Sequence, residues 1–153
     1  MARYASPGRV DWIGTRSVRR AELVQHQSVA LQMDGLEGDH ASAGRRALTL
    51  IQAEHTAIIA KFAGRDTVEP QVLRRNIVVS GLNLMGFRNS DLVIGTATIR
   101  VTGPCPPCSR MEEALGHGGY TAMRGHGGVY AEIIEPGRIT LGAAVVPAPR
   151  SSD

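Results

Sequence analysis

Apolar and polar residues alternate along several short stretches of this chain, and glycine or proline separates most of these stretches. Alternation with a period of two is typical of strands that bury one face. In the range 97–102, alanine, isoleucine and valine alternate with threonine and arginine, which predicts part of a hairpin or bulged strand pair broken at Gly95. Further strands are predicted at 47–52 and 76–81, and two more within 128–145 on either side of a Glu-Pro-Gly turn.

Helical spacing of apolar residues is confined to short stretches. It predicts one helix over 53–64, ended by Gly64, and a second over 68–75 with Pro70 in its first turn. A third short helix is expected to follow the prolines of the 104–116 stretch. We count about six to eight strands and three short helices. This count favours a mainly-β fold, a barrel decorated with a few short helices, over a doubly wound sheet.

Three regions are less regular. The range 10–31 is strand-like, and its part 23–31 is either a strand pair or one bent strand. The polar, glycine-rich stretch 33–46 is long for a loop inside a compact domain, and loops of that length are often functional. A second glycine-rich loop is predicted at 116–128. Its glycines are explained equally well by turn geometry and by a backbone cradle for phosphate.

Composition narrows the class of protein. Of 153 residues, 42% are hydrophobic and 20% are charged, so global disorder is excluded and one domain over 1–153 is expected, with a loose tail at 147–153. Aromatic residues make up only 4%, and the arginines are not clustered on one helix, so nucleic acid is not an expected partner. No stretch resembles a membrane span or a signal peptide, which predicts a cytoplasmic protein.

The basic residues are almost all arginine. Lys61 is the only lysine among the 17 basic residues, and the net charge is +3. Genome composition explains such a bias, but the planar guanidinium still grips phosphate and carboxylate. A pyridoxal phosphate enzyme forms a Schiff base with a lysine, and only Lys61, within a predicted helix, is available for it.

The stretch 102–111, Thr-Gly-Pro-Cys-Pro-Pro-Cys-Ser-Arg-Met, has the most specific chemistry in the chain. It joins a predicted strand to a predicted helix, so Cys108 is expected at or beside a helix N-terminus. Backbone N–H groups and the helix dipole stabilise a thiolate there, and Arg110 adds positive charge. We therefore prefer a reactive or ligating Cys108 over a buried, inert pair with Cys105.

Two other interpretations use both cysteines. Cys105 and Cys108 have the spacing of a zinc knuckle, but His117 and His126 follow too far apart for a compact finger. A Cys-x-x-Cys redox pair also lies between strand and helix, although thioredoxin-like motifs follow an early strand of an alternating α/β pattern. Both alternatives remain open at this point.

Polar residues in two other places are candidates for ligand binding. Arg74, Arg75 and Asn76 end a predicted helix and open a strand, where guanidinium and amide groups can hold an anionic, hydrogen-bonding ligand. A solvated helix end explains the arginines as well. Asp39 and His40 lie in the 33–46 loop, where His40 is a candidate proton donor, ligand or packing residue.

Four segments together resemble the MOSC domain, the module named after the C-terminal part of molybdenum cofactor sulfurases. They are 35–55, 72–84, 94–115 and 118–145. The resemblance covers about residues 5–146 and is closest to stand-alone bacterial members. It implies a β-rich barrel with short helices.

The resemblance also implies a site. Cys108 matches the family's cysteine, which binds the molybdenum of the cofactor or carries sulfur as a persulfide. Arg74 and Asn76 match positions that contact molybdopterin. Asp39 and His40 match a Gly-Asp-x-His pattern that here has no spacer. We add the neighbouring arginines, Arg46 and Arg110, as expected cofactor contacts.

These expectations lead to three hypotheses. In the first, the chain binds the molybdenum cofactor and reduces N-hydroxylated small molecules with electrons from a partner protein. In the second, Cys108 accepts sulfur from a cysteine desulfurase and passes it to a metal–sulfur centre. No pyridoxal phosphate Schiff base is expected within this chain, so the desulfurase must be a separate protein. In the third, both cysteines serve a structural zinc or redox module.

Overall fold

The computed structural model describes residues 7–18, 23–41, 43–105 and 127–149. Eleven strands, two α-helices and one 3-10 helix lie in these ranges. They are β1 (Gly8–Thr15), β2 (Val24–Gln25), β3 (Ser28–Gln32), β4 (Gly35–Leu36), β5 (Leu48–Gln52), α1 (Ala53–Phe62), α2 (Pro70–Leu73), β6 (Ile77–Ser80), η1 (Leu84–Phe87), β7 (Asp91–Ile94), β8 (Ala97–Pro104), β9 (Val129–Glu135), β10 (Gly137–Thr140) and β11 (Ala144–Pro147).

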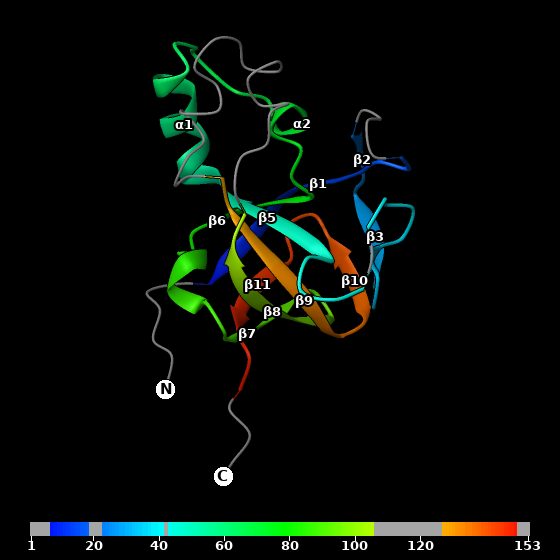
Figure 1. Cartoon of the computed structure of the whole chain (residues 1–153). Helices are drawn as coiled ribbons and strands as arrows, with labels where there is room; N and C mark the ends of the chain where they lie inside the picture. The colour runs from blue at the N-terminus through cyan, green and yellow to red at the C-terminus, as the bar shows by residue number, and fades with distance from the viewer. Residues whose placement is uncertain (1–6, 19–22, 42, 106–126, 150–153) are drawn as a thin grey trace.

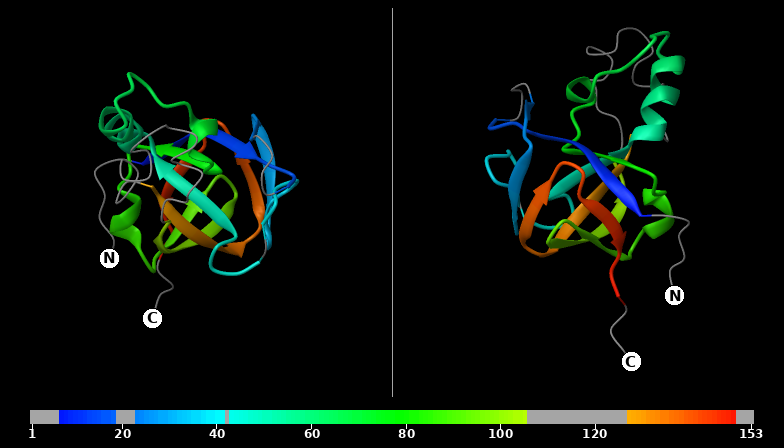
Figure 2. Two further views of the ribbon diagram at one scale, coloured as in Figure 1. Left: turned by 45° about the horizontal axis from the view of Figure 1, so that its top comes forward. Right: turned by 180° about the vertical axis from the view of Figure 1, so that it is seen from behind.

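Seven of the strands form a closed barrel (Figures 1 and 2). Their order is β11-β7-β8-β9-β5-β6-β1, and pairing of β11 with β1 closes the ring. The short strand β2 extends the sheet beyond β1. The pairing of β5 with β6 is parallel, because α1 and α2 lie between these two strands in the chain. The predicted mainly-β barrel with a few short helices is confirmed.

A second sheet packs beside the barrel. It has the order β10-β3-β4, and Ile139 pairs with Val29 at its centre. The sequence pattern predicted two strands over 128–145, but three strands lie there, and the middle one pairs with β3 rather than with its neighbours in the chain. The two pieces of 23–31 likewise separate, since β2 pairs with β1 and β3 joins the second sheet.

The alternating strands fill the barrel with apolar side chains. Leu48 and Leu50 of β5 and Val129, Ala131 and Ile133 of β9 are buried in the main core. Because successive side chains of a strand point to opposite faces, the residues between them lie on the outer face of the barrel. Thr49 and Tyr130 are such residues, and both are half-buried.

The helices cover a second, smaller core on the outside of the barrel. It joins Trp12 of β1, Ile51 of β5 and Val78 of β6 to Ile59 of α1 and Leu73 of α2. Figure 1 shows both helices at the same end of the barrel. The helix predicted over 53–64 is confirmed as α1, and Pro70 opens α2 as expected.

Some predictions fall where the structure describes nothing. The third helix and most of the 116–128 loop lie outside the described residues, and so do Cys108 and Arg110. At the other end of the chain, β11 reaches Pro147 and the Ala148 N–H bonds to the Asp91 carbonyl at 2.9 Å, so order continues past Val146. Within the described ranges no helix is long and apolar enough to span a membrane.

Candidate functional site

The two chain ends that flank residues 106–126 meet at one place on the barrel. The Cys105 N–H donates to the Gly128 carbonyl at 2.9 Å, and Pro104 pairs with Val129. Gly128 has a φ of +89°, and a Cβ there would collide with the Leu50 carbonyl. Glycine therefore lets β9 begin close against β5. The predicted Cys108 follows Cys105 by three residues in the chain and lies outside the described residues.

Tyr130 lies on the outer face at this junction. It pairs with Gly103 of β8 on one side and with Thr49 of β5 on the other. Its hydroxyl donates a hydrogen bond to the sulfur of Cys105, which is buried. The guanidinium carbon of Arg46 lies 5.0 Å from the centre of the Tyr130 ring, within the range of a cation–π contact.

Arg75 places a buried positive charge beside this tyrosine. Its side chain is only 5% exposed, and its Nε donates to the Gly127 carbonyl at 2.7 Å. A second, longer contact joins Nη1 to the Leu73 carbonyl at 3.5 Å. The two contacts hold the guanidinium between the end of α2 and the residues that precede β9. From the sequence, Arg75 was expected either to hold an anionic ligand with Arg74 and Asn76 or to lie at a solvated helix end. Its burial was not expected, because a solvated position is the usual one for arginine.

Asn76, next in the chain, holds three strands together. Its Oδ1 accepts from the Thr49 N–H at 3.1 Å and from the Thr49 hydroxyl at 3.0 Å. Its Nδ2 donates to the Gly14 carbonyl at 3.1 Å. Among the described residues these bonds leave one amide hydrogen of Asn76 without a partner. We call Asn76, Thr49, Tyr130 and Cys105 the outer polar row. Thr49 and Tyr130 are a cross-strand pair, Asn76 hydrogen-bonds to Thr49, and Tyr130 contacts Cys105.

Arg74 is the other half of the predicted pair. It is half-buried and ends α2 with a φ of 58°, in the left-handed region. Only Asn89 shares this feature among the described non-glycine residues. This conformation usually costs a non-glycine residue about 1 kcal/mol or more, and such residues are frequent at functional sites. The turn brings the chain from α2 into Arg75 and Asn76.

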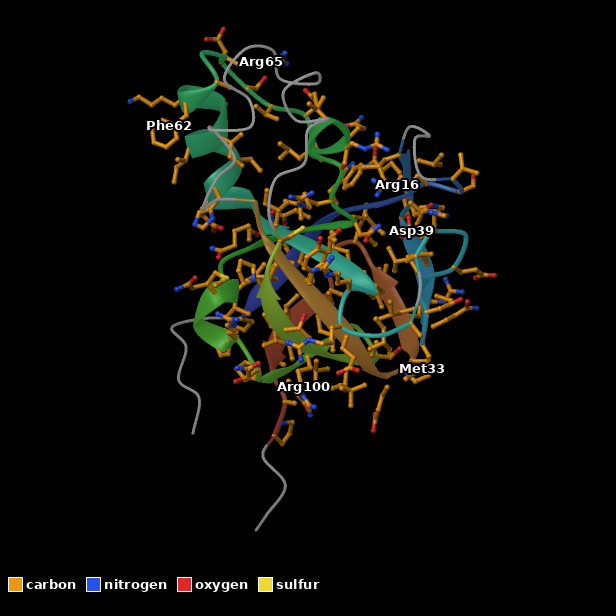
Figure 3. The ribbon with its side chains drawn as sticks, viewed as in Figure 1. Arg16, Met33, Asp39, Phe62, Arg65 and Arg100 are labelled. Atoms are coloured by element: carbon orange, nitrogen blue, oxygen red, sulfur yellow. The ribbon has the colours of Figure 1, made fainter. Side chains whose placement is uncertain are left out.

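Asp39 and His40, both predicted site residues, make hydrogen bonds that hold a loop in place. The Arg16 N–H donates to Asp39 Oδ1 at 2.9 Å, and the His40 N–H donates to the Arg16 carbonyl at 2.6 Å. Figure 3 shows Arg16 and Asp39 close together. These bonds fasten the 33–46 loop to the chain that leaves β1. No described contact joins either residue to the outer polar row.

Of the predicted site residues, the structure brings Arg46 and Asn76 to the outer polar row, and Arg74 precedes Asn76 by two residues in the chain. Tyr130 was missed, whereas Arg75, a candidate for ligand binding from the sequence, is buried beside this row. The alternation of side chains in β9 could have indicated Tyr130, because it is the outward-facing residue between two inward-facing apolar residues. Among the described residues no group of three histidine, cysteine or acidic side chains could hold a metal ion. The row offers cations and hydrogen-bond donors, which suit a polar or anionic ligand.

The environment of Tyr130 raises the pKa of its phenol above the usual 10.0. Burial is the largest cause, followed by the charge and the hydrogen bond of Cys105. Arg46 and Arg75 act in the opposite direction, because a nearby cation favours the phenolate. The phenol therefore remains protonated, and able to donate, at neutral and moderately alkaline pH.

This shift predicts a pH dependence of stability. The folded protein keeps the Tyr130 proton to a higher pH than the unfolded chain does. The stabilisation that the protonated phenol gives the fold is therefore complete below about pH 10, and it is lost as pH rises through the raised pKa. Between about pH 8 and about pH 11, the free energy of unfolding measured with urea should fall less for Tyr130→Phe than for wild type. Tyr120→Phe serves as the control, and an equal loss in wild type and Tyr130→Phe would contradict the assignment.

Comparison with known proteins gives the family. The model of the MOSC domain matches residues 37–146. No curated protein matches the chain. Among solved structures, the YuaD protein of Bacillus subtilis has a TM-score of 0.80 at 16% identity, covering 95% of this chain and 98% of that one.

Two YiiM structures are also similar. The protein from Escherichia coli has a TM-score of 0.71 at 25% identity, covering 95% of this chain and 72% of that one. The protein from Geobacillus stearothermophilus has a TM-score of 0.74 at 22% identity, with 94% and 76% covered. The family match spans most of the barrel, including β5, β6, β8 and β9, which carry the outer polar row. This chain is therefore a member of the MOSC domain family, which is associated with binding of the molybdenum cofactor.

Proposed function

We propose that this protein binds the molybdenum cofactor and reduces N-hydroxylated small molecules, with Cys108 as the molybdenum ligand. The observation that carries the proposal is the position of the outer polar row beside Cys105 and Gly127. These two residues flank the 106–126 segment, which contains Cys108. Arg75 and Tyr130 both contact the ends of that segment, through Gly127 and Cys105.

The described residues suit this cofactor chemically. Molybdopterin has a phosphate and a polar pterin, which need cationic and hydrogen-bonding partners. Arg46 is exposed and Arg74 is half-buried, so both can reach a bound anion. Asn76 keeps one amide hydrogen that no described residue accepts. None of the residues in the outer polar row is a carboxylate that would repel the phosphate. A thiolate such as Cys108 is the type of ligand that soft metals prefer.

Each described residue then has a distinct task. Arg74 and Arg46 hold the anionic part of the cofactor, and Asn76 orients its polar ring. Arg75 and Tyr130 fix the two ends of the Cys108 segment. Contacts from Asp39, His40 and Arg110 to the cofactor are part of the same proposal. The bound metal supplies two-electron transfer, and an electron-donor protein provides the electrons. The overall reaction converts an N-hydroxyl compound, two electrons and two protons into the reduced nitrogen compound and water.

The proposal is tested on wild-type protein purified from a host that makes the cofactor and has ample molybdate. We expect elemental analysis to find close to one molybdenum per chain. We also expect reduction of an aryl amidoxime when a reduced viologen dye donates the electrons. Folded protein without molybdenum would overturn the proposal. A mass adduct of one sulfur on Cys108, formed with a cysteine desulfurase and cysteine, would then identify the chain as a sulfur carrier.

A further inference from the structure

The outer side of α1 carries two exposed apolar side chains. Phe62, in the last turn of the helix, is 63% exposed, and Ile58, one turn earlier, is 36% exposed. Side chains four residues apart are neighbours on a helix, so these two form one small apolar patch. The helix packs onto the barrel through other residues, Ile59 and Ala60, which are buried. Apolar side chains that gather on a surface, with polar residues around them, mark sites of contact with other proteins.

Basic residues border this patch. Lys61 precedes Phe62 in the chain, Arg65 follows it by three residues, and both are exposed. Figure 3 shows Phe62 and Arg65 at the end of the molecule away from Met33. We call Ile58, Lys61, Phe62 and Arg65 the α1 face. Its apolar centre and positive edge are complementary to a protein surface that has an apolar spot among carboxylates.

The nearby carboxylates do not pair with Lys61. Glu54, in the first turn of α1, accepts the Gly81 N–H at 2.8 Å, so its carboxylate is held at the end of β6. Asp66 and Glu69 come after the helix, in the chain that leads to α2. Within the described ranges, the ion pairs lie elsewhere, on β1 and between β7 and β8. The charge of Lys61 is therefore available to a partner.

The α1 face lies beside the candidate site. α1 follows directly after β5, which carries Thr49, and α2 comes shortly before Asn76. Ile59 of α1 and Leu73 of α2 are buried in the same cluster, and Figure 1 shows both helices at one end of the barrel. A protein bound to the α1 face would therefore lie next to the outer polar row.

The size and charge of the α1 face suit a partner that binds briefly. Two apolar side chains bury too little area for a permanent complex, and small interfaces are typical of electron-transfer encounters. Opposite charges around the contact speed such encounters. A donor that carries one electron must bind and leave twice in each two-electron reduction. A second copy of this chain fits less well, because Lys61 and Arg65 of the two copies would face each other.

We propose that the α1 face is the docking surface for an acidic electron-donor protein. An apolar group of the donor covers Phe62, and its carboxylates pair with Lys61 and Arg65. The inference rests on the proposed function, which needs such a donor. Two reduced donors are each oxidised by one electron, two protons are taken up, and the N–O bond of the amidoxime breaks. The products are the amidine and water.

The donor used in the test is a plant-type [2Fe–2S] ferredoxin, an acidic protein that carries one electron. The molybdenum-loaded, full-length protein reduces an aryl amidoxime with reduced ferredoxin or with a reduced viologen dye, which is too small to need a docking surface. We expect Phe62→Ala and Lys61→Glu each to lower the ferredoxin-driven kcat/KM by about tenfold or more. The viologen-driven rate should stay the same. High salt should slow the wild type with ferredoxin only, because it screens the charges.

Matched controls change the same kinds of side chain elsewhere. Met33→Ala truncates an apolar side chain that is 52% exposed, and Arg138→Glu reverses an exposed positive charge on β10. Figure 3 shows Met33 far from Phe62. Both controls should keep the ferredoxin-driven rate of wild type.

Cross-linking gives a readout that needs neither molybdenum nor activity. Lys61 is the only lysine of the chain. A carbodiimide joins a lysine amine directly to a carboxylate, so ferredoxin bound to the α1 face should form an amide bond with Lys61, which mass spectrometry locates. Lys61→Arg should lose this product and keep the ferredoxin-driven rate, since arginine retains the positive charge but its guanidinium does not couple.

Three results would overturn the inference. The first is a wild type that accepts electrons from the viologen dye but not from ferredoxin. The second is an unchanged ferredoxin-driven rate in both Phe62→Ala and Lys61→Glu. The third is a Lys61 cross-link between two copies of the chain in place of one to ferredoxin. Failure of the proposed function looks different, because the protein would then hold no molybdenum and the viologen dye would drive no reduction, while cross-linking would still report on the α1 face.

Discussion

Replacing Cys108 with serine is expected to abolish molybdenum binding, while replacing Cys105 with serine leaves most of it. A serine hydroxyl stays protonated near neutral pH and is a poor ligand for a metal that prefers thiolate. We expect the molybdenum content of Cys108→Ser to fall below about a tenth of wild type, as measured by elemental analysis of both proteins from the same host. Reduction of an aryl amidoxime should fall in proportion.

Cys105→Ser is the matched control, and the structure explains why it is mild. Cys105 is buried, its sulfur accepts the Tyr130 hydrogen bond, and its N–H bonds to Gly128. Serine keeps the backbone bond and can accept from the tyrosine hydroxyl. Equal loss of function in both variants would contradict a single molybdenum ligand. It would instead favour a zinc or redox site that uses both cysteines.

Much of the barrel could be predicted from the sequence because its strands obey local rules. The alternation in β8, the turn at Gly95 and the apolar stretch of β6 each mark an element without reference to the rest of the chain. The pairing of β10 with β3 could not be found in this way. It joins Ile139 to Val29, far apart in the sequence, and both strands have patterns that fit a neighbour in the chain equally well.

The same distinction between local features and long-range contacts applies to the site. Arg75 and Asn76 were selected from a local feature, a predicted helix end that opens a strand. Arg46 was added as a neighbour of Asp39 and His40 in the 33–46 loop. The burial of Arg75 could not be predicted, because nothing local shows that its guanidinium would lie against the Gly127 carbonyl. That contact exists only once β6 and the start of β9 come together.

The second large effect is on stability, and it comes from Asn76. Asn76→Ala would remove the acceptor of the Thr49 N–H and the donor to the Gly14 carbonyl, in a place where Asn76 is only 7% exposed. Each buried group left unpaired costs about 1–3 kcal/mol. We therefore expect the free energy of unfolding to fall by roughly 3 kcal/mol, and the melting temperature by roughly 10 °C. Urea and thermal unfolding measure both.

Two further variants separate the hydrogen bonds from general effects of substitution. Asn83→Ala changes an exposed asparagine whose side chain makes no capping bond, and should leave stability almost unchanged. Asn76→Asp keeps the oxygen that accepts from Thr49 but loses the donor to Gly14 at neutral pH. Burial beside a carbonyl raises the pKa of such a carboxyl, so its neutral, donating form stabilises the fold below about pH 4 and that stabilisation is lost as pH rises. Asn76→Asp should therefore approach wild-type stability in acid, and a constant deficit at every pH would refute the role given to Asn76.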